Sequence, residues 1–262
     1  MARQLVGYET HQSAAVLTLN SPQTRNALSM PMVDAILRAL QRAEEDSDVR
    51  ALILTGSESA FSAGMDLKEL HRALDHMKFD NEGGGVWADA LRGEQLIDRL
   101  YRFPKPTIAA VNGAAAAAGA ALVSACDMAV AEPDARIGYP ELRRGIQAGM
   151  VLIHLMRLIG ERHARFLVLT GELITADRAK EIGLINDVVP KDQLMPTAMK
   201  WAASVAMNAP KAETITKALL EKFSAQAVSM KMAEYKEAPL LTDECRAGLE
   251  AFFEKRPAPW AV

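Results

Sequence analysis

The sequence of 262 residues has little of what marks secreted, metal-binding or nucleic-acid-binding proteins. Its two cysteines, Cys126 and Cys245, lie in apolar or helical contexts without metal-ligand spacing, so we expect buried thiols and a reducing, cytoplasmic location. The formal net charge is −3, and basic and acidic residues are intermixed along the chain. This charge pattern does not support nucleic-acid binding.

Long apolar segments are also missing. The first ten residues, MARQLVGYET, have no apolar centre of the kind that a secretory signal needs. No uninterrupted apolar run approaches the length of a membrane span. We therefore expect neither a signal peptide nor a membrane partner.

Signatures of several catalytic classes are absent. His71 and His76, the closest pair among five histidines, would not share a helix face well, so we expect no metal site. No Gly-x-Ser-x-Gly stretch is present, which argues against a serine hydrolase with a nucleophile elbow. Gly113 and Gly119 are too far apart for a dinucleotide-binding turn.

Half of the residues are apolar, enough for a substantial core in a chain of this length. Residues 14–19 and 49–55 have the composition of short buried strands. Between them, residues 31–45 repeat apolar side chains at helical spacing behind a possible cap at Ser29. Strand, amphipathic helix and buried strand in this order predict a βαβ unit and a parallel sheet.

The rest of the chain continues as a mixed pattern and then becomes helical. We predict strands at residues 128–131, 136–138 and 184–189 and helices at residues 87–103, 150–159, 165–169 and 174–183. After Lys191 only helical periodicity is found. We therefore predict an α/β body over residues 1–190 and a helical region over residues 191–262.

Residues 107–127, TIAAVNGAAAAAGAALVSACD, are the stretch on which our functional prediction centres. A short apolar strand reaches Asn112-Gly113, and the alanine-rich segment after it favours a helix. The first turn of such a helix has unpaired N–H groups and partial positive charge, and residues 114–118 have almost no side chain to cover them. The stretch thus predicts a site for an anion or a carbonyl oxygen that gains charge, the alternative being a helix of small residues packed in the core.

A second strand ends in a glycine-containing loop, in the segment GSESAFSAGMDLKEL. Gly64 precedes Met65, and Asp66 is placed to begin a helix. This loop can present backbone N–H groups to a ligand. The following residues, 71–85, have weak periodicity, so we predict a mobile loop or a loosely held helix near the site.

One carboxylate completes the constellation. Glu141 follows a predicted strand and the conformationally restricted Pro140. Two N–H groups, from the loop at Gly64–Asp66 and from the helix near Ala118, would polarise a carbonyl and acidify its α-carbon, beside which Glu141 could move a proton. The alternative for Glu141 is an ordinary surface side chain at a strand end.

Five segments in order resemble the enoyl-CoA hydratase/isomerase (crotonase) superfamily: LNSPQTRNALS, AFSAGMDLKEL, KPTIAAVNGAAAAAGAALVSACD, GYPELRRGI and LTGELITADRAKEIGLINDVV. The resemblance covers essentially the whole chain from about residue 10. It implies an α/β fold built as a spiral of ββα units, with a helical C-terminal region that packs in homotrimers or dimers of trimers. It also implies an acyl-CoA thioester as the ligand, with coenzyme A as part of the substrate and no separate cofactor.

By this resemblance, the N–H groups of Met65 and Ala118 hold the thioester oxygen and Glu141 acts as the catalytic acid/base. The remaining substrate-binding residues that it implies are Arg25, Ala27, Ser62, Gly64, Asp66, Leu67, Ala121 and Pro140, with Arg25, Ala27, Ser62, Asp66 and Leu67 on the coenzyme A side.

The sequence departs from the family at Ala121, where typical hydratases carry a first catalytic glutamate. Hydration needs both water activation and protonation of carbon, which two carboxylates normally divide. With one carboxylate, a 1,3 proton shift that isomerises a double bond is simpler. Hydration with a substitute acid from residues 75–89, decarboxylation, thioester hydrolysis and a non-catalytic acyl-CoA-binding subunit are the alternatives.

Overall fold

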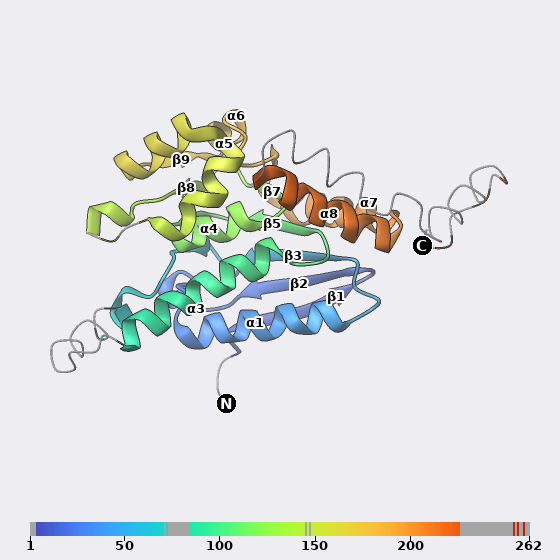
Figure 1. Cartoon of the computed structure of the whole chain (residues 1–262), viewed down its shortest axis with the longest axis horizontal. Coiled ribbons are helices and arrows are strands. Elements are labelled where there is room, and N and C mark those ends of the chain that lie inside the picture. The colour runs from blue at the N-terminus through green and yellow to red at the C-terminus, as the bar shows by residue number, and fades with distance from the viewer. Residues whose placement is uncertain are drawn as a thin grey trace.

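The computed structural model describes residues 4–70, 72, 84–144, 146, 148–225, 254, 256 and 259. Within them the chain forms an α/β fold with two sheets (Figure 1). The larger sheet has the strand order β1-β2-β3-β5-β7-β10. Its strands are β1 (Val6–His11), β2 (Ala14–Leu19), β3 (Ala51–Gly56), β5 (Thr107–Val111), β7 (Met128–Ala131) and β10 (Asp187–Val188). Strand β1 pairs antiparallel with β2, and the other neighbours are parallel.

The smaller sheet has the order β4-β6-β8-β9. Its strands are β4 (Ala60–Ser62), β6 (Ala114–Ala116), β8 (Arg136–Gly138) and β9 (Leu173–Thr175). The first three are parallel and β9 is antiparallel to β8. Three times the chain leaves the larger sheet, adds a strand to the smaller one and then enters a helical segment, which confirms the predicted spiral of ββα units.

The helices cover the sheets. They are α1 (Met30–Glu45), α3 (Gly84–Tyr101), α4 (Ala118–Ala125), α5 (Gly149–Thr170), α6 (Ala176–Glu181), α7 (Leu194–Ala206) and α8 (Pro210–Ala225), with 3-10 turns η1 (Pro22–Thr24), η2 (Glu141–Arg144) and η3 (Lys191–Gln193). Helices α1 and α3 lie beside each other below the larger sheet in Figure 1. The Ser29 side chain accepts a hydrogen bond from the Met32 N–H and caps α1, as its position predicts.

Both faces of the larger sheet are buried, which explains why its inner strands are apolar throughout. In β3, Leu52 and Leu54 belong to the core on the side of α1 and α3. Ile53, between them, points to the opposite face and packs with Leu194 and Ala198 of α7. The predicted boundary at residue 190 is not tested by this packing and stays a prediction.

The alanine-rich stretch differs from the prediction. Residues 114–116 form strand β6, paired with β8 through Ala115 and Ile137, and helix α4 begins only at Ala118. The helix propensity of alanine is overridden by a strand pairing that joins segments distant in sequence. The prediction that residues 114–118 form a first helical turn is therefore wrong, although Ala118 itself begins α4.

Other predictions differ in length. Strands β1, β4 and β9 were not predicted, and β10 is two residues long instead of six. The prediction of two helices within residues 150–169 is confirmed, because α5 consists of two helices joined at a kink where Gly160 has non-helical dihedral angles (φ 71°, ψ 165°). The predicted loop at residues 71–85 lies outside the described residues except for residue 72 and the start of α3.

Cys126 is buried, as predicted, and burial raises the pKa of its thiol to about 12; Cys245 lies outside the described residues. No helix in the described part of the chain has the length and apolar character needed to cross a membrane.

Asn26 holds together the loops at one end of the sheets. It is fully buried at a positive φ of 55°. Its Nδ2 donates to the carbonyl oxygens of Ser57 (3.1 Å) and Ala60 (2.8 Å), and its Oδ1 accepts from the Ser21 N–H (2.8 Å) and the Ser57 hydroxyl (3.2 Å). One side chain thus satisfies donors and acceptors of three separate segments.

We expect Asn26→Ala to lower the free energy of unfolding by about 3 kcal/mol, because it leaves these buried groups unpaired. Urea denaturation monitored by circular dichroism measures the change. The matched control is Gln41→Ala, which removes one exposed hydrogen bond to Glu45 and should change stability by less than about 0.5 kcal/mol. Equal effects of the two substitutions would contradict the assignment.

Candidate active site

A pocket of about 830 Å³ opens at one edge of the smaller sheet. Its wall follows the strand order: Met65 comes after β4, Ala118 after β6, Glu141 after β8, and Leu173 begins β9. Parallel strands bring their carboxyl ends to the same edge, so segments far apart in sequence converge there. This pocket is our candidate site.

The loop after β4 is held by a parallel bridge between Leu28 and Met65. The Leu28 N–H donates to the Gly64 carbonyl (2.8 Å), and the Asp66 N–H donates to the Leu28 carbonyl (3.3 Å). Met65 lies between these two bonds. Among the described residues, no acceptor is bonded to the Met65 N–H, which is therefore available to a ligand in the pocket.

The start of α4 is held in a similar way. The Ala117 N–H donates to the Gly138 carbonyl (2.9 Å), and Ala117 itself has the positive φ of 52°. The next amide, that of Ala118, is the first of the helix and has no protein acceptor within the described part of the chain. The helix dipole adds partial positive charge at this point.

Gly64 brings the two segments into contact. Its φ is 86°, and a Cβ at this position would lie 2.7 Å from the Ala116 carbonyl oxygen and 3.1 Å from the Ala118 nitrogen. Only a residue without a side chain permits so close an approach. The Met65 and Ala118 amides thus belong to backbone segments in direct contact and can serve one carbonyl oxygen together.

Glu141 is the first residue of η2 and is 9% exposed. Its Oε2 has no hydrogen-bond partner among the described residues. Burial raises the pKa of this carboxyl above its usual range, while a backbone hydrogen bond and the Arg144 charge act in the opposite direction. The side chain is therefore not the ordinary surface glutamate of the alternative hypothesis.

A buried tyrosine, which the sequence reasoning missed, joins the segment that carries Ala118 to the segment that carries Glu141. Tyr139 lies two residues before Glu141 and is fully buried. Its hydroxyl is 2.5 Å from the Ser124 hydroxyl and 3.4 Å from the Ala120 carbonyl oxygen, both on α4. Burial raises the pKa of Tyr139, so the phenol stays neutral. The link couples the helix that carries the Ala118 amide to the segment that carries Glu141.

Eight of the predicted site residues line the pocket: Arg25, Ala27, Met65, Asp66, Leu67, Ala118, Pro140 and Glu141. The other three lie behind the wall. Ser62 is fully buried and bonds to the Asn26 carbonyl (2.8 Å) and the Gly64 N–H (3.2 Å), and Ala121 is 1% exposed within α4. The catalytic and substrate-binding roles of all eleven residues stay predictions.

Sequence reasoning assigned no role to Arg143 and Arg144, which also line the pocket. The signal was present in the segment GYPELRRGI, where two arginines follow Glu141 within three residues.

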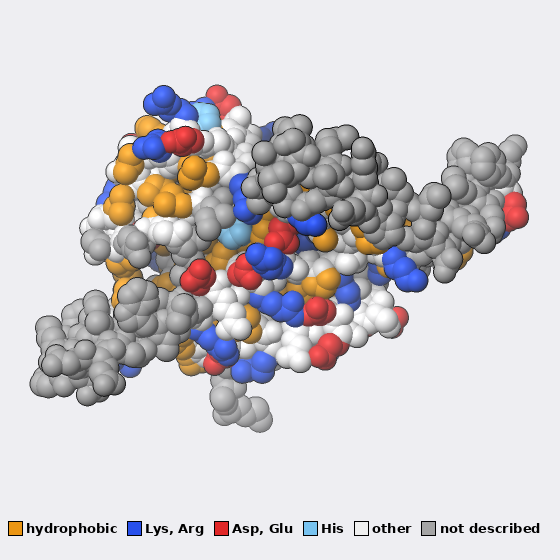
Figure 2. All heavy atoms as spheres, viewed as in Figure 1, with side chains coloured by type: hydrophobic (Ala, Val, Ile, Leu, Met, Phe, Trp, Pro, Cys, Tyr) orange, Lys and Arg blue, Asp and Glu red, His pale blue; other side chains and the backbone are white. Residues whose placement is uncertain are grey.

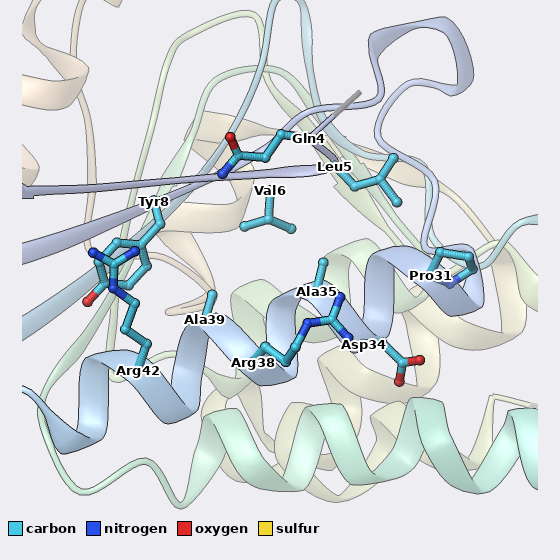
Figure 3. A pocket seen from close by; sticks show the side chains of 10 residues that line it. All are labelled: Gln4, Leu5, Val6, Tyr8, Pro31, Asp34, Ala35, Arg38, Ala39 and Arg42. Atoms are coloured by element: carbon cyan, nitrogen blue, oxygen red, sulfur yellow. The ribbon is translucent and has the colours of Figure 1, made fainter. Parts of the chain in front are cut away.

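Another pocket, of about 580 Å³, lies between β1 and α1 (Figure 3). There the Arg42 guanidinium stacks on the Tyr8 ring at 3.9 Å from its centroid. Its one acidic group, Asp34, is paired with Arg92. This pocket does not combine an unpaired carboxyl with free amides, and we assign the chemistry to the first one. No group of three His, Cys, Asp or Glu side chains in the described residues is arranged to hold a metal ion.

We expect Gly64→Ala to lower the free energy of unfolding by about 2 to 4 kcal/mol, because its Cβ meets backbone atoms and the positive φ disfavours alanine. The control is Gly7→Ala. Its Cβ would meet Thr18 at ordinary van der Waals distances, the nearest atom being the Thr18 Cβ at 3.5 Å, and the substitution should leave stability unchanged or slightly raised. Thermal and urea denaturation measure both changes. If the Gly64→Ala protein is as stable as the Gly7→Ala protein, the close contact between Gly64 and the backbone of Ala116 to Ala118 is contradicted.

The raised pKa of Glu141 predicts a pH dependence of stability. The unfolded carboxyl ionises first as pH rises, so the buried carboxyl stabilises the fold at low pH and loses this contribution as pH passes through the folded pKa. Glu141→Gln removes the effect. We expect the stability of the native chain to fall relative to Glu141→Gln as pH rises from about 4, near the ordinary pKa of a glutamate, through the raised pKa of the folded carboxyl.

Urea denaturation of both proteins across this range tests the sign. The exposed Glu172→Gln serves as the control and should show no such divergence. A native chain that gains stability over Glu141→Gln as pH rises would show that Glu141 is stabilised as a carboxylate instead.

Comparison with known proteins agrees with this architecture. Residues 9–262 match the family model described as enoyl-CoA hydratase/isomerase. A relative from Thermus thermophilus is 41% identical over 246 residues, covering 93% of this chain and 95% of the relative. The 2,3-dehydroadipyl-CoA hydratase of Escherichia coli is 34% identical over 249 residues, covering 94% of each chain.

A solved enoyl-CoA hydratase structure from Bacillus anthracis superposes with a TM-score of 0.89 at 30% identity, covering 98% of this chain and 99% of that one. The fold, the family match over nearly the whole chain and these identities together show that this chain belongs to the enoyl-CoA hydratase/isomerase family of enzymes.

Proposed function

We propose that the enzyme isomerises a double bond in an acyl-CoA thioester through an enolate, with Glu141 as its single acid/base. The observation that carries this proposal is that one pocket contains a buried carboxyl and two backbone amides that have no hydrogen-bond partner among the described residues. Ala121, at the position of a further glutamate in typical hydratases, has no group that could share the proton transfers. Coenzyme A is part of the substrate, and no separate cofactor enters the proposal.

The thioester oxygen binds between the Met65 and Ala118 amides, where it gains negative charge as the α-carbon loses a proton. Glu141 removes this proton from the α-carbon of a 3-enoyl thioester, and the electrons of the C–H bond form a dienolate. The same carboxyl then returns the proton to the γ-carbon, which moves the double bond to the 2,3 position. Atoms and charge balance without water or another reactant.

Burial of Glu141 suits this chemistry. A carboxyl whose pKa is raised toward neutrality is a stronger base when ionised and holds the transferred proton more readily. The hydrogen bond between the Tyr139 and Ser124 hydroxyls holds α4 beside the segment that carries Glu141. In this proposal the amides and the carboxyl thus contact adjacent atoms of one substrate.

Hydration is the first alternative and would need a second acid/base. Residues 75–89 contain acidic side chains, but these side chains lie outside the described ones. Decarboxylation and thioester hydrolysis would use the same amides. A non-catalytic acyl-CoA-binding subunit would use the pocket without turnover.

We also propose assembly as a homotrimer or dimer of trimers, with residues 191–262 taking part in it. Large apolar side chains are exposed on α5 and at the start of β9: Met156, Leu158, Phe166, Leu169 and Leu173 are 39 to 68% exposed. Figure 2 shows apolar side chains gathered over the region of these elements. A face of this kind favours contact with another protein surface.

Assays with trans-3-hexenoyl-CoA and trans-2-hexenoyl-CoA test the reaction. We expect conversion of the first to the conjugated isomer without water uptake, and a loss of roughly 10²- to 10⁴-fold in kcat for Glu141→Gln, because the only acid/base is removed. The Glu141→Gln protein should still bind a saturated acyl-CoA, which would show that the substitution has not disrupted the pocket.

Rapid hydration of trans-2-hexenoyl-CoA without isomerisation would contradict the isomerase proposal. Binding without any turnover by the native chain would support the non-catalytic subunit instead.

A further inference from the structure

Two arginines at one end of the pocket have no role in the proton transfer. Arg143 and Arg144 end η2, immediately beyond Glu141, and both line the pocket. Neither forms an ion pair with a carboxylate among the described residues. Their charges are thus available to a ligand.

The strand order of the smaller sheet defines two ends of the pocket, one at β4 and the other at β9. Arg25 and Lys68 lie at the β4 end, where the Ala63 N–H donates to the Arg25 carbonyl (2.9 Å) and joins the two loops. Arg143 lies at the β9 end, where its Nη2 donates to the Thr170 carbonyl (3.1 Å) just before β9. The Met65 and Ala118 amides and then Glu141 come between these two ends.

This order of groups indicates which end of the pocket holds coenzyme A and which end holds the acyl chain. A thioester oxygen at the Met65 and Ala118 amides leaves coenzyme A on one side and the acyl chain on the other. The acyl carbons must run past Glu141, which exchanges their protons, so the acyl chain extends toward β8 and β9. Coenzyme A then extends toward β4, Arg25 and Lys68, which leaves Arg143 and Arg144 at the acyl end.

A hydrocarbon chain gives these arginines nothing to bind. The other side chains at this end include Ile146, Val151 and Leu173, which suit an apolar chain by themselves. The Arg144 charge also opposes the effect of burial on Glu141, which weakens the base. Both arginines are exposed to solvent. A negative group on the acyl chain would give them a partner, since a guanidinium binds a carboxylate through paired hydrogen bonds.

We propose that the acyl chain of the substrate ends in a carboxylate, which Arg144 binds with a contribution from Arg143. The enzyme thus acts on the coenzyme A thioesters of short dicarboxylic acids. This inference rests on the proposed acyl-CoA function of the pocket.

Binding of two saturated esters to the purified full-length chain tests the inference without turnover. Glutaryl-CoA and valeryl-CoA share a five-carbon acyl chain and differ at its end, a carboxylate in the first and a methyl group in the second. By isothermal titration calorimetry we expect glutaryl-CoA to bind at least about tenfold more tightly, as one charge-assisted hydrogen bond implies.

Arg144→Gln should remove this preference and leave the affinity for valeryl-CoA within about threefold, because it deletes the carboxylate contact alone. Arg143→Gln should reduce the preference in part. Arg25→Gln is the matched control at the other end and should weaken both esters by the same factor. Circular dichroism and thermal denaturation confirm that each variant is folded.

Valeryl-CoA binding as tightly as glutaryl-CoA, or a preference for glutaryl-CoA that survives in Arg144→Gln, would overturn the inference and leave the proposed function standing. If neither ester binds to the native chain, the proposed acyl-CoA function and the inference fail together.

Discussion

The contact between Gly64 and the first residues of α4 is the constraint on which the site depends. Strands β4 and β6 are neighbours in a parallel sheet, so their following segments leave the sheet at the same edge. Gly64 lets these segments touch, since any Cβ would collide with the Ala116 carbonyl. Within the part of the chain that the structure describes, the Met65 and Ala118 amides have no protein acceptor, because neither takes part in the hydrogen bonds of the sheets.

The polar groups of the pocket region fall into two kinds. Asn26, Tyr139 and Ser124 are buried and hydrogen-bonded, and they fix the position of the loops and of α4. Glu141 is buried, and its Oε2 has no partner among the described residues. An unpaired buried carboxyl that lines a pocket is a candidate for contact with a ligand.

The positively charged side chains of the pocket are distributed along the strand order of the smaller sheet. Lys68 and Arg25 are near the loop after β4, and Arg144 belongs to η2, the turn after β8 that also carries Glu141. The Met65 and Ala118 amides come between them in the order of the sheet and hold no formal charge. The sheet order thus places positively charged side chains toward both ends of the pocket wall, with uncharged amides between them.

Much of the fold follows from local pattern. Residues 14–19 were predicted as a strand with the bounds that the structure gives, and α1 and its cap at Ser29 were predicted to within one residue, because apolar periodicity and capping are encoded in neighbouring residues. Met65, Ala118 and Glu141 could be selected from the sequence as a possible constellation. The three-residue strands β4, β6 and β9 could not, since each is stabilised by a partner distant in the chain.

By itself the sequence determined the family, the parallel α/β architecture and the lone carboxyl left by Ala121. Only the tertiary structure decided that the alanine-rich stretch divides at Ala117, that Tyr139 reaches α4, and that Arg144 faces the same pocket as Glu141. The physical reason is that strand pairing and side-chain convergence depend on distances in space, which residue spacing along the chain does not specify.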